Sequence, residues 1–398
     1  MFPLPIFLKK LIQVGTLHVV DAKGRKQTFK GAPGPEVTMR LTDPWLPWKI
    51  FFRPGLGAGE AYMKGTLTLD GNAGSYGLLY LVTKNMEWRP DNPMNTSGSD
   101  PFSRFRSWFA QANPVAISIK NVAHHYDLSG ALYDLFLDKD KQYSCAYFAD
   151  PKNTLEKAQE DKKAHLAKKL LLKKGMTLLD IGCGWGGLGL SLHEITGAKV
   201  TGVTLSEQQL SVANERAKKD KVDKDVEFRL QDYRDVPETF DRIVSVGMFE
   251  HVGRQNYGAF FKKVYSCLKE DGVALIHTIG RADGPGSTDP WTGRYIFPGG
   301  YAPSLSEIMP HIEKAGLYIT DLEVLRLHYA ETLREWRQRT FEHKAEIVEL
   351  YNEEFFRMWD FYLSLSEGAF RNLGHVVFQI QLAKKVDTVP MTRDYMYK

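Results

Sequence analysis

At 398 residues the chain exceeds the usual size of a single hydrophobic core, so we expect two domains or one domain with a large addition. Apolar residues make up 43% and charged residues 25%, which excludes a fibrous or largely disordered protein. The net charge of +4 is too small to imply nucleic-acid binding. Three cysteines without a CxxC pair favour a reducing compartment over a disulfide framework.

The chain has no apolar run long enough to cross a bilayer, which takes about 18 residues. Residues 1–15 do not read as a signal peptide, because Pro3 and Pro5 interrupt the apolar run and two lysines follow it. We therefore expect a cytoplasmic protein. Six lysines between residues 162 and 174 would draw a helix toward anionic lipid headgroups, at roughly 1 kcal/mol per charge. The alternative is an ordinary solvated helix face.

Residues 37–43 and 65–71 alternate in the manner of strands, and glycines punctuate residues 55–62. These patterns predict a small α+β or β-rich N-terminal domain over residues 1–100. A cluster of Pro, Asn, Ser and Gly at residues 89–101 has the composition of a linker, so a second domain is expected over 101–398.

Beyond the linker, predicted strands alternate with predicted helices. The strands are expected at 177–182, 198–205, 226–232, 240–247, 272–280 and 375–385, and two of the helices at 206–220 and 257–269. Apolar strands joined by helices indicate right-handed crossovers and a parallel sheet, which is a doubly wound α/β domain. A helical insertion around 326–372 is expected to form two helices packed over this sheet.

Gly182, Gly184 and Gly187 have the GxGxxG spacing and directly follow the first strand of this domain. The motif alone is weak evidence of function, and dinucleotide binding is the first function to consider for it. However, the second strand ends at Thr204 rather than at the acidic residue that binds a nicotinamide dinucleotide's ribose.

Polar residues also end other strands of this domain. Asp180 lies at the end of the first strand, and Asp232 and Glu250 follow the third and fourth. Side chains at the carboxyl ends of parallel strands converge on one crevice. This set resembles the Rossmann-like S-adenosylmethionine methyltransferases.

A closer resemblance is carried by six stretches, at residues 123–138, 143–148, 178–189, 203–209, 240–253 and 275–280. In this order they resemble the cyclopropane fatty acid synthase family, which includes the mycolic acid cyclopropane synthases. The similarity extends from about Asn121 to the C-terminus. Residues 55–72 are also similar to the N-terminal domain of the phospholipid-acting members.

The resemblance implies transfer of a methylene from S-adenosylmethionine to the cis double bond of an acyl chain in a membrane phospholipid. The intermediate carbocation would lose a proton and close to a cyclopropane ring. Relatives with the same loops make methyl-branched or methylene-bearing chains, so these products stay open. A small-molecule methyltransferase of the same fold and a catalytically silent lipid-binding protein are further alternatives.

The resemblance also implies a bound bicarbonate ion as the base. Its contacts would be Cys145, Glu250, His277, the backbone of Ile279, and Tyr329. We interpret Cys145 as a wall of this anion pocket, because sulfonium chemistry needs no thiolate nucleophile. The alternative for Cys145 is a buried small hydrophobic residue.

The cofactor contacts carried over from the family follow the same motifs. Tyr143 and Ser144 are assigned to the methionine end, Gly182 and Gly184 to close backbone contact, Thr204 and Gln209 to the ribose, and Asp232 to the adenine, with Asp180 beside the loop. Aromatic faces would stabilise the carbocation. The candidates are Tyr147, Phe148, Phe249 and Tyr295, with simple packing as the alternative.

We expect no metal, because Glu250 and His251 are adjacent in sequence, as are His124 and His125, and neither pair has a third ligand at metal spacing. The expected partner is a phospholipid bilayer surface, with peripheral attachment to the inner membrane and with homodimerisation possible. Aromatic residues favour a membrane interface, so the N-terminal domain is expected to dock there through Trp45, Trp48, Phe51 and Phe52.

Overall fold

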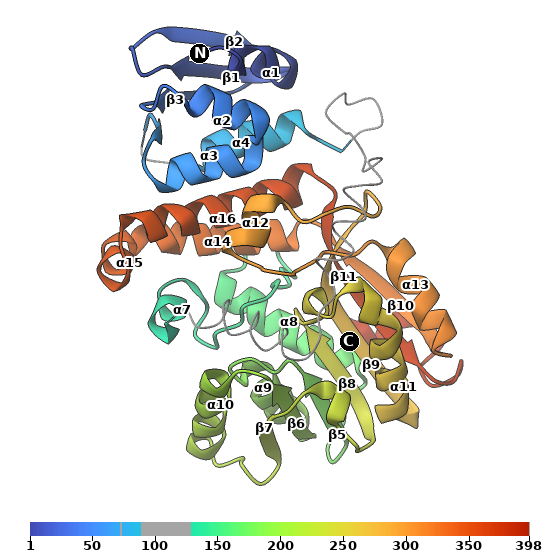
Figure 1. Ribbon diagram of the computed structural model, residues 1–398. Coiled ribbons are helices and arrows are strands. Elements are labelled where there is room, and N and C mark those ends of the chain that lie inside the picture. Colours follow the sequence, from blue (N-terminus) through green and yellow to red (C-terminus); the bar gives the residue numbers. More distant parts are fainter. Residues whose placement is uncertain (72–73, 89–128, 398) are drawn as a thin grey trace. The chain divides into compact units, whose positions relative to one another are not determined.

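The computed structural model describes residues 1–71, 74–88 and 129–397 (Figure 1). The chain divides into two compact units. Unit 1 comprises Met1–Ser99, Thr288–Pro298 and Ala330–His375, and unit 2 comprises Asp100–Ser287, Gly299–Tyr329 and Val376–Lys398. The predicted linker and the His124–His125 pair lie outside the described residues, so the domain boundary near residue 100 and the absence of a metal stay predictions.

Unit 1 contains a four-stranded sheet in the order β2-β1-β3-β4. The strands are β1 Val14–Val20, β2 Lys26–Lys30, β3 Ala32–Leu41 and β4 Leu67–Leu69, and the N-terminal helices are α1 Leu4–Leu11, α2 Leu46–Phe52, α3 Pro54–Met63 and α4 Tyr76–Asn85. Strand β1 pairs antiparallel with β2 and parallel with β3, and β4 pairs antiparallel with β3. The expected small α+β unit is confirmed.

The helical segment near the C-terminus forms three helices rather than the expected two. They are α14 His328–Glu342, α15 Lys344–Leu350 and α16 Glu353–Asn372. Helix α16 packs against α3 and α4 within unit 1. Its buried Asp360 carboxylate accepts hydrogen bonds from the Tyr62 hydroxyl at 2.6 Å and the Ser75 amide at 2.8 Å. These long-range bonds explain why the segment groups with the N-terminal helices and not with the parallel sheet.

Unit 2 contains a seven-stranded sheet in the order β10-β11-β9-β8-β5-β6-β7. The strands are β5 Thr177–Ile181, β6 Lys199–Thr204, β7 Val226–Leu230, β8 Phe240–Val246, β9 Leu268–Arg281, β10 Tyr318–Leu325 and β11 His375–Ala383. Pairing is parallel from β7 through β6, β5 and β8 to β9, and antiparallel between β10 and β11. The doubly wound fold is confirmed. Strand β10, a partly exposed edge strand, was not predicted.

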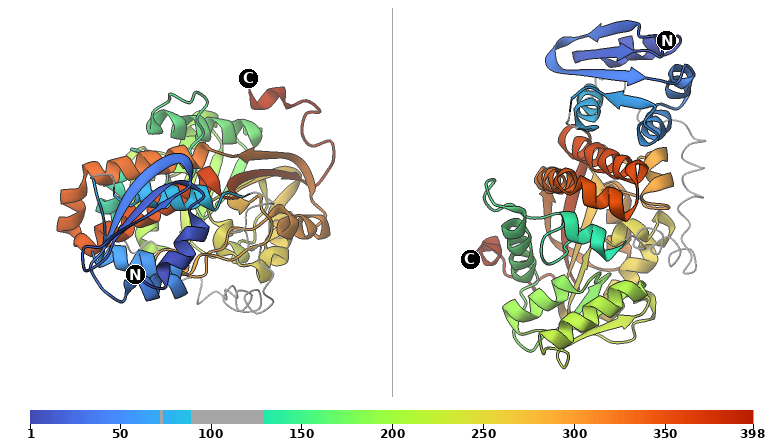
Figure 2. Two further views of the ribbon diagram at one scale, coloured as in Figure 1. Left: turned by 90° about the horizontal axis from the view of Figure 1, so that it is seen from above. Right: turned by 90° about the vertical axis from the view of Figure 1, so that its left-hand side faces the viewer.

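Helices cover both faces of this sheet (Figures 1 and 2). Successive residues of β5 face opposite sides of the sheet. Leu178 packs in a core with α8 Leu155–Lys169, α9 Gly187–Thr196 and α10 Glu207–Lys219. Leu179 packs in the other core, with α11 Tyr257–Cys267 and α13 Leu305–Lys314. Within the described residues, no helix is both long and apolar enough to span a bilayer.

The lysine-rich segment of this unit differs from the expectation of an exposed helix face. Lys162, Lys163 and Lys169 of α8 are buried, so for them both the lipid-headgroup reading and the solvated-face reading are wrong. The Lys163 ammonium pairs with Asp140 at 2.8 Å, and that of Lys169 pairs with Glu323 at 2.6 Å. The exposed lysines of the run are Lys168, Lys173 and Lys174.

Candidate active site

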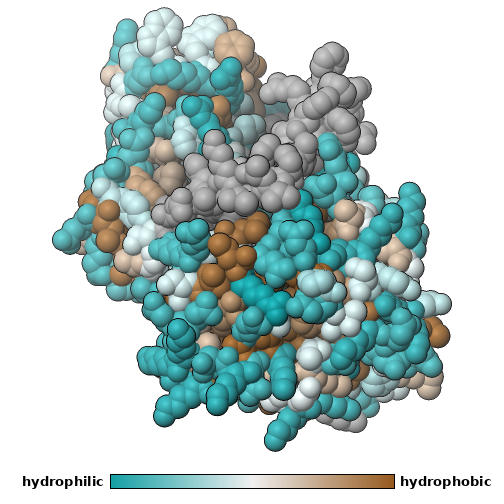
Figure 3. Space-filling view, turned by 60° about the horizontal axis from the view of Figure 1, so that its bottom comes forward, coloured by the Kyte–Doolittle hydropathy of each residue, from teal (hydrophilic) through white to brown (hydrophobic). Residues whose placement is uncertain are grey.

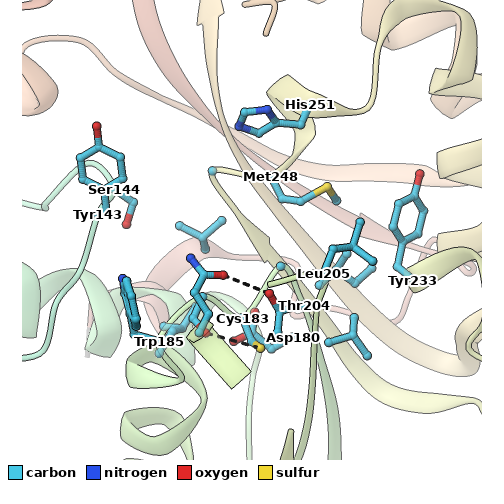
Figure 4. A pocket seen from close by; sticks show the side chains of 18 of the residues that line it. Tyr143, Ser144, Asp180, Cys183, Trp185, Thr204, Leu205, Tyr233, Met248 and His251 are labelled. Atoms are coloured by element: carbon cyan, nitrogen blue, oxygen red, sulfur yellow. Dashed lines mark hydrogen bonds between the residues drawn. The ribbon is translucent and has the colours of Figure 1, made fainter. Parts of the chain in front are cut away.

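A pocket opens at the carboxyl ends of β5, β6, β7 and β8, where parallel strands bring their terminal loops together (Figure 4). The chain segment before α8 forms its other wall. All eight residues predicted to bind the cofactor line this pocket: Tyr143, Ser144, Asp180, Gly182, Gly184, Thr204, Gln209 and Asp232. The structure therefore gathers residues that are up to 89 positions apart, from 143 to 232.

The glycine loop between β5 and α9 shapes one side of the pocket. Gly182, Gly184 and Gly186 have φ angles of +82°, +55° and +79°, which L side chains rarely adopt. A Cβ on Gly184 would meet nothing within 4 Å, whereas one on Gly186 would lie 2.8 Å from the Ala213 Cβ. Gly184 thus leaves space beside the pocket, and Gly186 allows the loop to pack against α10.

Two polar residues follow β6 and β7. The Thr204 hydroxyl donates to the Gln209 Oε1 atom at 3.0 Å, which fixes both side chains at the pocket wall. The Asp232 carboxylate accepts from the Arg234 amide at 2.9 Å and from its guanidinium at 2.6 Å. Although burial opposes the effect, these hydrogen bonds from Arg234 hold the pKa of Asp232 below its usual value. Asp232 is therefore an ionised acceptor.

Asp180 is buried beneath the glycine loop, and burial raises the pKa of its carboxyl to about 7. Its Oδ2 atom has no hydrogen-bond partner among the described residues. A buried acceptor without a partner is costly unless a ligand or water supplies a donor. This side chain therefore fits a pocket whose ligand carries hydrogen-bond donors.

Several pocket residues were not predicted from the sequence. Trp185, Tyr233, Met248 and His251 also line the pocket. Figure 4 shows Met248 and His251 on the opposite side from Trp185. Burial lowers the pKa of His251 to about 4, so its ring is neutral. His251 could have been found from its place in the motif after the fourth strand.

The adjacent Glu250 belongs to the same short 3-10 helix, Phe249–His251, but does not line this pocket. The Ile279 amide donates to Glu250 Oε1 at 2.6 Å, while Glu250 Oε2 has no partner among the described residues. Burial raises the pKa of Glu250 to about 7. Glu250 can thus hold or release a proton near neutral pH.

His277 lies near the end of β9, beside β8, and its carbonyl accepts from the Gly247 amide at 2.9 Å. The Gln379 Nε2 atom lies 3.2 Å from His277 Nδ1. Because an amide nitrogen donates, Nδ1 accepts and Nε2 carries the ring proton. Burial lowers the pKa of His277 to about 3, so the ring is a neutral donor.

Cys145 is buried, and its Sγ atom donates to the Ala146 carbonyl at 3.3 Å. The same segment is joined to the start of α14, where the Phe148 amide donates to His328 Nδ1 at 2.9 Å. The Tyr147 ring stacks on that of His328 with 5.0 Å between centroids. The structure therefore links the Cys145 segment to the residue before Tyr329, and Glu250 to Ile279, but the roles of these residues stay predictions.

The aromatic candidates differ in their surroundings. Phe249 is fully buried and stacks on Tyr257 with 4.5 Å between centroids, so it belongs to the core, as the packing alternative predicted. The Tyr295 hydroxyl donates to Glu60 at 2.9 Å within unit 1. Tyr147 is sandwiched between the rings of His165 and His328.

The strand order, the glycine loop after β5, and a pocket with Thr204 in place of an acidic residue define the class of S-adenosylmethionine-dependent methyltransferases. Within this class, residues 115–380 match the family described as mycolic acid cyclopropane synthetase. The chain belongs to this family, that of the cyclopropane fatty acid synthases and fatty acid methyltransferases.

Two curated relatives cover nearly the whole chain. A cyclopropane-fatty-acyl-phospholipid synthase of Escherichia coli K12 is 43% identical over 354 residues, 88% of each chain. A probable fatty acid methyltransferase of Pseudomonas putida is 37% identical over 382 residues, 93% of this chain and 94% of the relative.

Solved structures resemble about two thirds of the chain. The cyclopropane synthase MmaA2 from Mycobacterium tuberculosis has a TM-score of 0.65 and 34% identity, covering 69% of this chain and 99% of that one. The mycolic acid cyclopropane synthase CmaA1, complexed with SAH and CTAB, has a TM-score of 0.63 and 34% identity, covering 66% and 97%. The chain is thus an S-adenosylmethionine-dependent methyltransferase.

Proposed function

We propose that this enzyme transfers a methylene from S-adenosylmethionine to the cis double bond of an unsaturated acyl chain in a membrane phospholipid and forms a cyclopropane fatty acid. The observation that carries the proposal is the buried Glu250–Ile279 pair, with Glu250 Oε2 left without a partner among the described residues and not lining the cofactor pocket. The name of the Escherichia coli relative supports a phospholipid substrate.

The cofactor supplies a methyl group on a sulfonium, which needs an electron pair but no base from the protein. In the proposed site Tyr143 and Ser144 hold the methionine end, and Thr204 and Gln209 hold the ribose. An alkene is not deprotonated before it attacks, so this pocket needs only to position its ligands and exclude water. Ring closure afterwards requires that one proton leave the methylated chain.

A bicarbonate ion held by Cys145, Glu250, His277, Ile279 and Tyr329 is the proposed base. A small anion suits a site beside a hydrocarbon chain, because a long charged side chain would be costly to bury there. With its pKa raised to about 7, Glu250 can be protonated and donate to the anion, and neutral His277 can donate through Nε2. The Ile279 carbonyl accepts from the Thr278 hydroxyl at 3.0 Å and keeps a second lone pair for the ion's hydroxyl.

A second product class is favoured by the names of other relatives. Besides the Pseudomonas putida protein, a tuberculostearic acid methyltransferase of Mycobacterium tuberculosis is 36% identical over 376 residues. In a relative of this kind the carbocation would lose one proton to give a methylene-bearing acyl chain, and a saturated methyl-branched chain would also need a hydride donor. The ring product is preferred because the Escherichia coli relative, 43% identical, is named a cyclopropane-fatty-acyl-phospholipid synthase. Proton loss alone does not separate the ring from its methylene isomer, because both products lose one proton from the methylated chain.

The decisive experiment incubates purified protein with S-adenosylmethionine and vesicles of unsaturated phospholipid, and analyses the fatty acyl methyl esters by mass spectrometry and NMR. We expect cyclopropane protons in the NMR spectrum. NMR is needed because the methylene-branched product is an isomer of the ring. A methyl-branched or methylene product would establish the second candidate, and turnover only on soluble acceptors would overturn the lipid assignment.

Glu250→Gln tests the proposed base site. We expect turnover to fall by at least about 100-fold, since assisted proton transfer contributes that much or more, while binding of S-adenosylhomocysteine is unchanged. Bicarbonate-free buffer should lower the turnover of the unmodified enzyme in the same way. The control is Glu270→Gln, which changes an exposed carboxylate in the same manner. Undiminished turnover of Glu250→Gln and in bicarbonate-free buffer would reject the base assignment.

The proposed substrate also requires a membrane-docking surface, and unit 1 offers one. The docking patch comprises Trp45, Trp48 and Phe52, which are 69%, 40% and 68% exposed. The fourth residue predicted for docking, Phe51, is only partly exposed and is left out of the patch. Trp48 stacks on Phe52 with 5.9 Å between ring centroids. Arg53 and Lys64 line a cavity beside the patch and have no ion pair among the described residues. Aromatic rings next to cations suit the interface of an anionic bilayer.

On the face drawn in Figure 3, apolar side chains gather in an area that hydrophilic side chains flank in part. An apolar area on a protein surface favours an apolar ligand or partner. This surface is therefore in keeping with an acyl-chain substrate.

A further inference from the structure

We infer that Lys162 is a positioning residue for the cofactor: its ammonium orients the Ser144 hydroxyl and provides the positive charge that the cofactor's carboxylate requires. The inference rests on the proposed placement of the methionine end at Tyr143 and Ser144. It adds a residue that lies outside the pocket lining and acts through one that lines it.

The charge balance of α8 singles out Lys162. Among its three buried lysines, Lys163 and Lys169 each have a carboxylate partner, at 2.8 Å and 2.6 Å. Lys162 is 0% exposed, yet no carboxylate lies within 4.0 Å of its ammonium in the described part of the chain. A buried ammonium without a counter-charge is costly, so a bound anion would stabilise it.

The hydrogen bonds of Lys162 point to the pocket wall. Its Nζ atom donates to Ser144 Oγ at 2.8 Å and to Gln142 Oε1 at 2.9 Å. Both acceptors line the cofactor pocket. Because Ser144 Oγ accepts from Lys162, the hydroxyl proton of Ser144 is left to donate to a different acceptor. A ligand carboxylate at this wall would be such an acceptor, and an ammonium behind the hydroxyl strengthens the bond.

A second residue of α8 holds the same segment in place. The Gln159 Nε2 atom donates to the carbonyls of Gln142 and Ser144, at 3.2 Å and 3.0 Å. Gln159 and Lys162 are three positions apart and so lie on one face of the helix. Gln159 thereby fixes the backbone of the segment, and Lys162 fixes its side chains. The contacts of Gln159 are therefore purely structural, whereas those of Lys162 also bring a positive charge to the pocket wall.

Asp138 acts on Lys162 through its charge but does not replace the missing ion-pair partner. Asp138 Oδ1 accepts from the Gln142 amide at 2.9 Å, and its Oδ2 accepts from the Asp140 amide at 3.0 Å. Burial lowers the pKa of Lys162 to about 8, although Asp138 and Cys145 oppose that change. The ammonium is therefore mostly protonated at neutral pH, and a bound carboxylate would favour that form further.

The test compares two ligands that differ only in the carboxylate: S-adenosylhomocysteine and its decarboxylated analogue. In Lys162→Met, measured by isothermal titration calorimetry, we expect the Kd of S-adenosylhomocysteine to rise at least about tenfold, as loss of a buried charge contact predicts. The Kd of the decarboxylated analogue should change less than about twofold, because it never contacts the positive charge.

The matched control is Lys169→Met, which removes another buried lysine of the same helix. It should change the Kd of both ligands little. If Lys162→Met raises the Kd of both ligands equally, or raises neither, the inference is overturned in favour of a structural role. If Lys162→Met does not fold, Ser144→Ala replaces it and should show the same preference for the decarboxylated ligand. Failure of the unmodified protein to bind either ligand would instead refute the proposed cofactor site.

Discussion

Asp180 and Glu250 are buried carboxyl groups that gain or lose a proton near neutral pH. Burial raises both pKa values to about 7, and each carboxyl keeps one oxygen without a partner among the described residues. A buried carboxylate without a partner lowers the free energy of unfolding when it ionises. A bound ligand that donates a hydrogen bond to it can offset this loss of stability. The two residues differ in place: Asp180 lines the cofactor pocket, and Glu250 does not.

This loss of stability depends on pH. The pKa of Asp180 is about 7 in the folded protein and near the ordinary value of 3.8 when unfolded. Its contribution to stability is thus complete below about pH 3.8 and is lost as the pH rises to about 7. Asp180→Asn removes this dependence. We expect its unfolding free energy to exceed that of the unmodified protein by about 3 kcal/mol more at pH 8.5 than at pH 5.

Thermal or urea unfolding of the ligand-free protein at the two pH values measures this difference. Asp223→Asn, which changes an exposed carboxylate, is the control and should show no such trend. Parallel pH curves for Asp180→Asn and the unmodified protein would show that Asp180 ionises normally.

At the scale of elements, two glycines of the loop between β5 and α9 have different roles: Gly184 leaves space for a ligand, and Gly186 allows the loop to pack against α10. Gly184→Ala places a methyl group in open space beside the pocket, at a backbone cost of about 1 to 2 kcal/mol. We expect a folded protein whose Kd for S-adenosylhomocysteine rises more than about tenfold, because the methyl group occupies the ligand's space. Calorimetric titration at a temperature well below unfolding measures this change.

Gly186→Ala is the counterpart. Its methyl group would lie 2.8 Å from the Ala213 Cβ and 2.9 Å from the Phe228 ring, so we expect it to lower stability by about 3 kcal/mol or more. Gly186 does not line the pocket, so any surviving folded protein should bind the ligand normally. The opposite pattern, a stable Gly186→Ala or normal binding by Gly184→Ala, would contradict this division.

At the scale of the whole molecule, the prediction concerns the docking patch. Changing Trp45, Trp48 and Phe52 together to alanine should lower co-sedimentation with anionic phospholipid vesicles by at least about tenfold, because large apolar side chains are lost from the interface. Turnover on detergent-solubilised lipid should be retained. Trp88→Ala removes another exposed tryptophan of unit 1 and serves as the control. Unchanged sedimentation of the triple variant would place docking elsewhere.

Deleting residues 1–100 is a poorer test of docking. Unit 1 also contains α16, whose buried Asp360 bonds to Tyr62 and Ser75. Phe361 of the same helix contacts the Tyr62 ring, with 6.0 Å between centroids. The deletion would expose these groups and create a new apolar surface, so binding of the truncated protein to vesicles would not report on the patch.

The sequence by itself determined the parallel strands β5 to β9, the glycine loop and the pocket residues from Tyr143 to Asp232. The strands and the loop follow from local pattern and chain order, because parallel strands must end at the same edge of a sheet. The pocket residues were assigned from the resemblance to the cyclopropane fatty acid synthase family. Tertiary structure alone decided that Lys162 is buried with no carboxylate partner among the described residues while Lys163 has one, and that α16 belongs with unit 1. Burial and pairing depend on partners far apart in the chain, such as Asp360 and Tyr62, which no local pattern specifies.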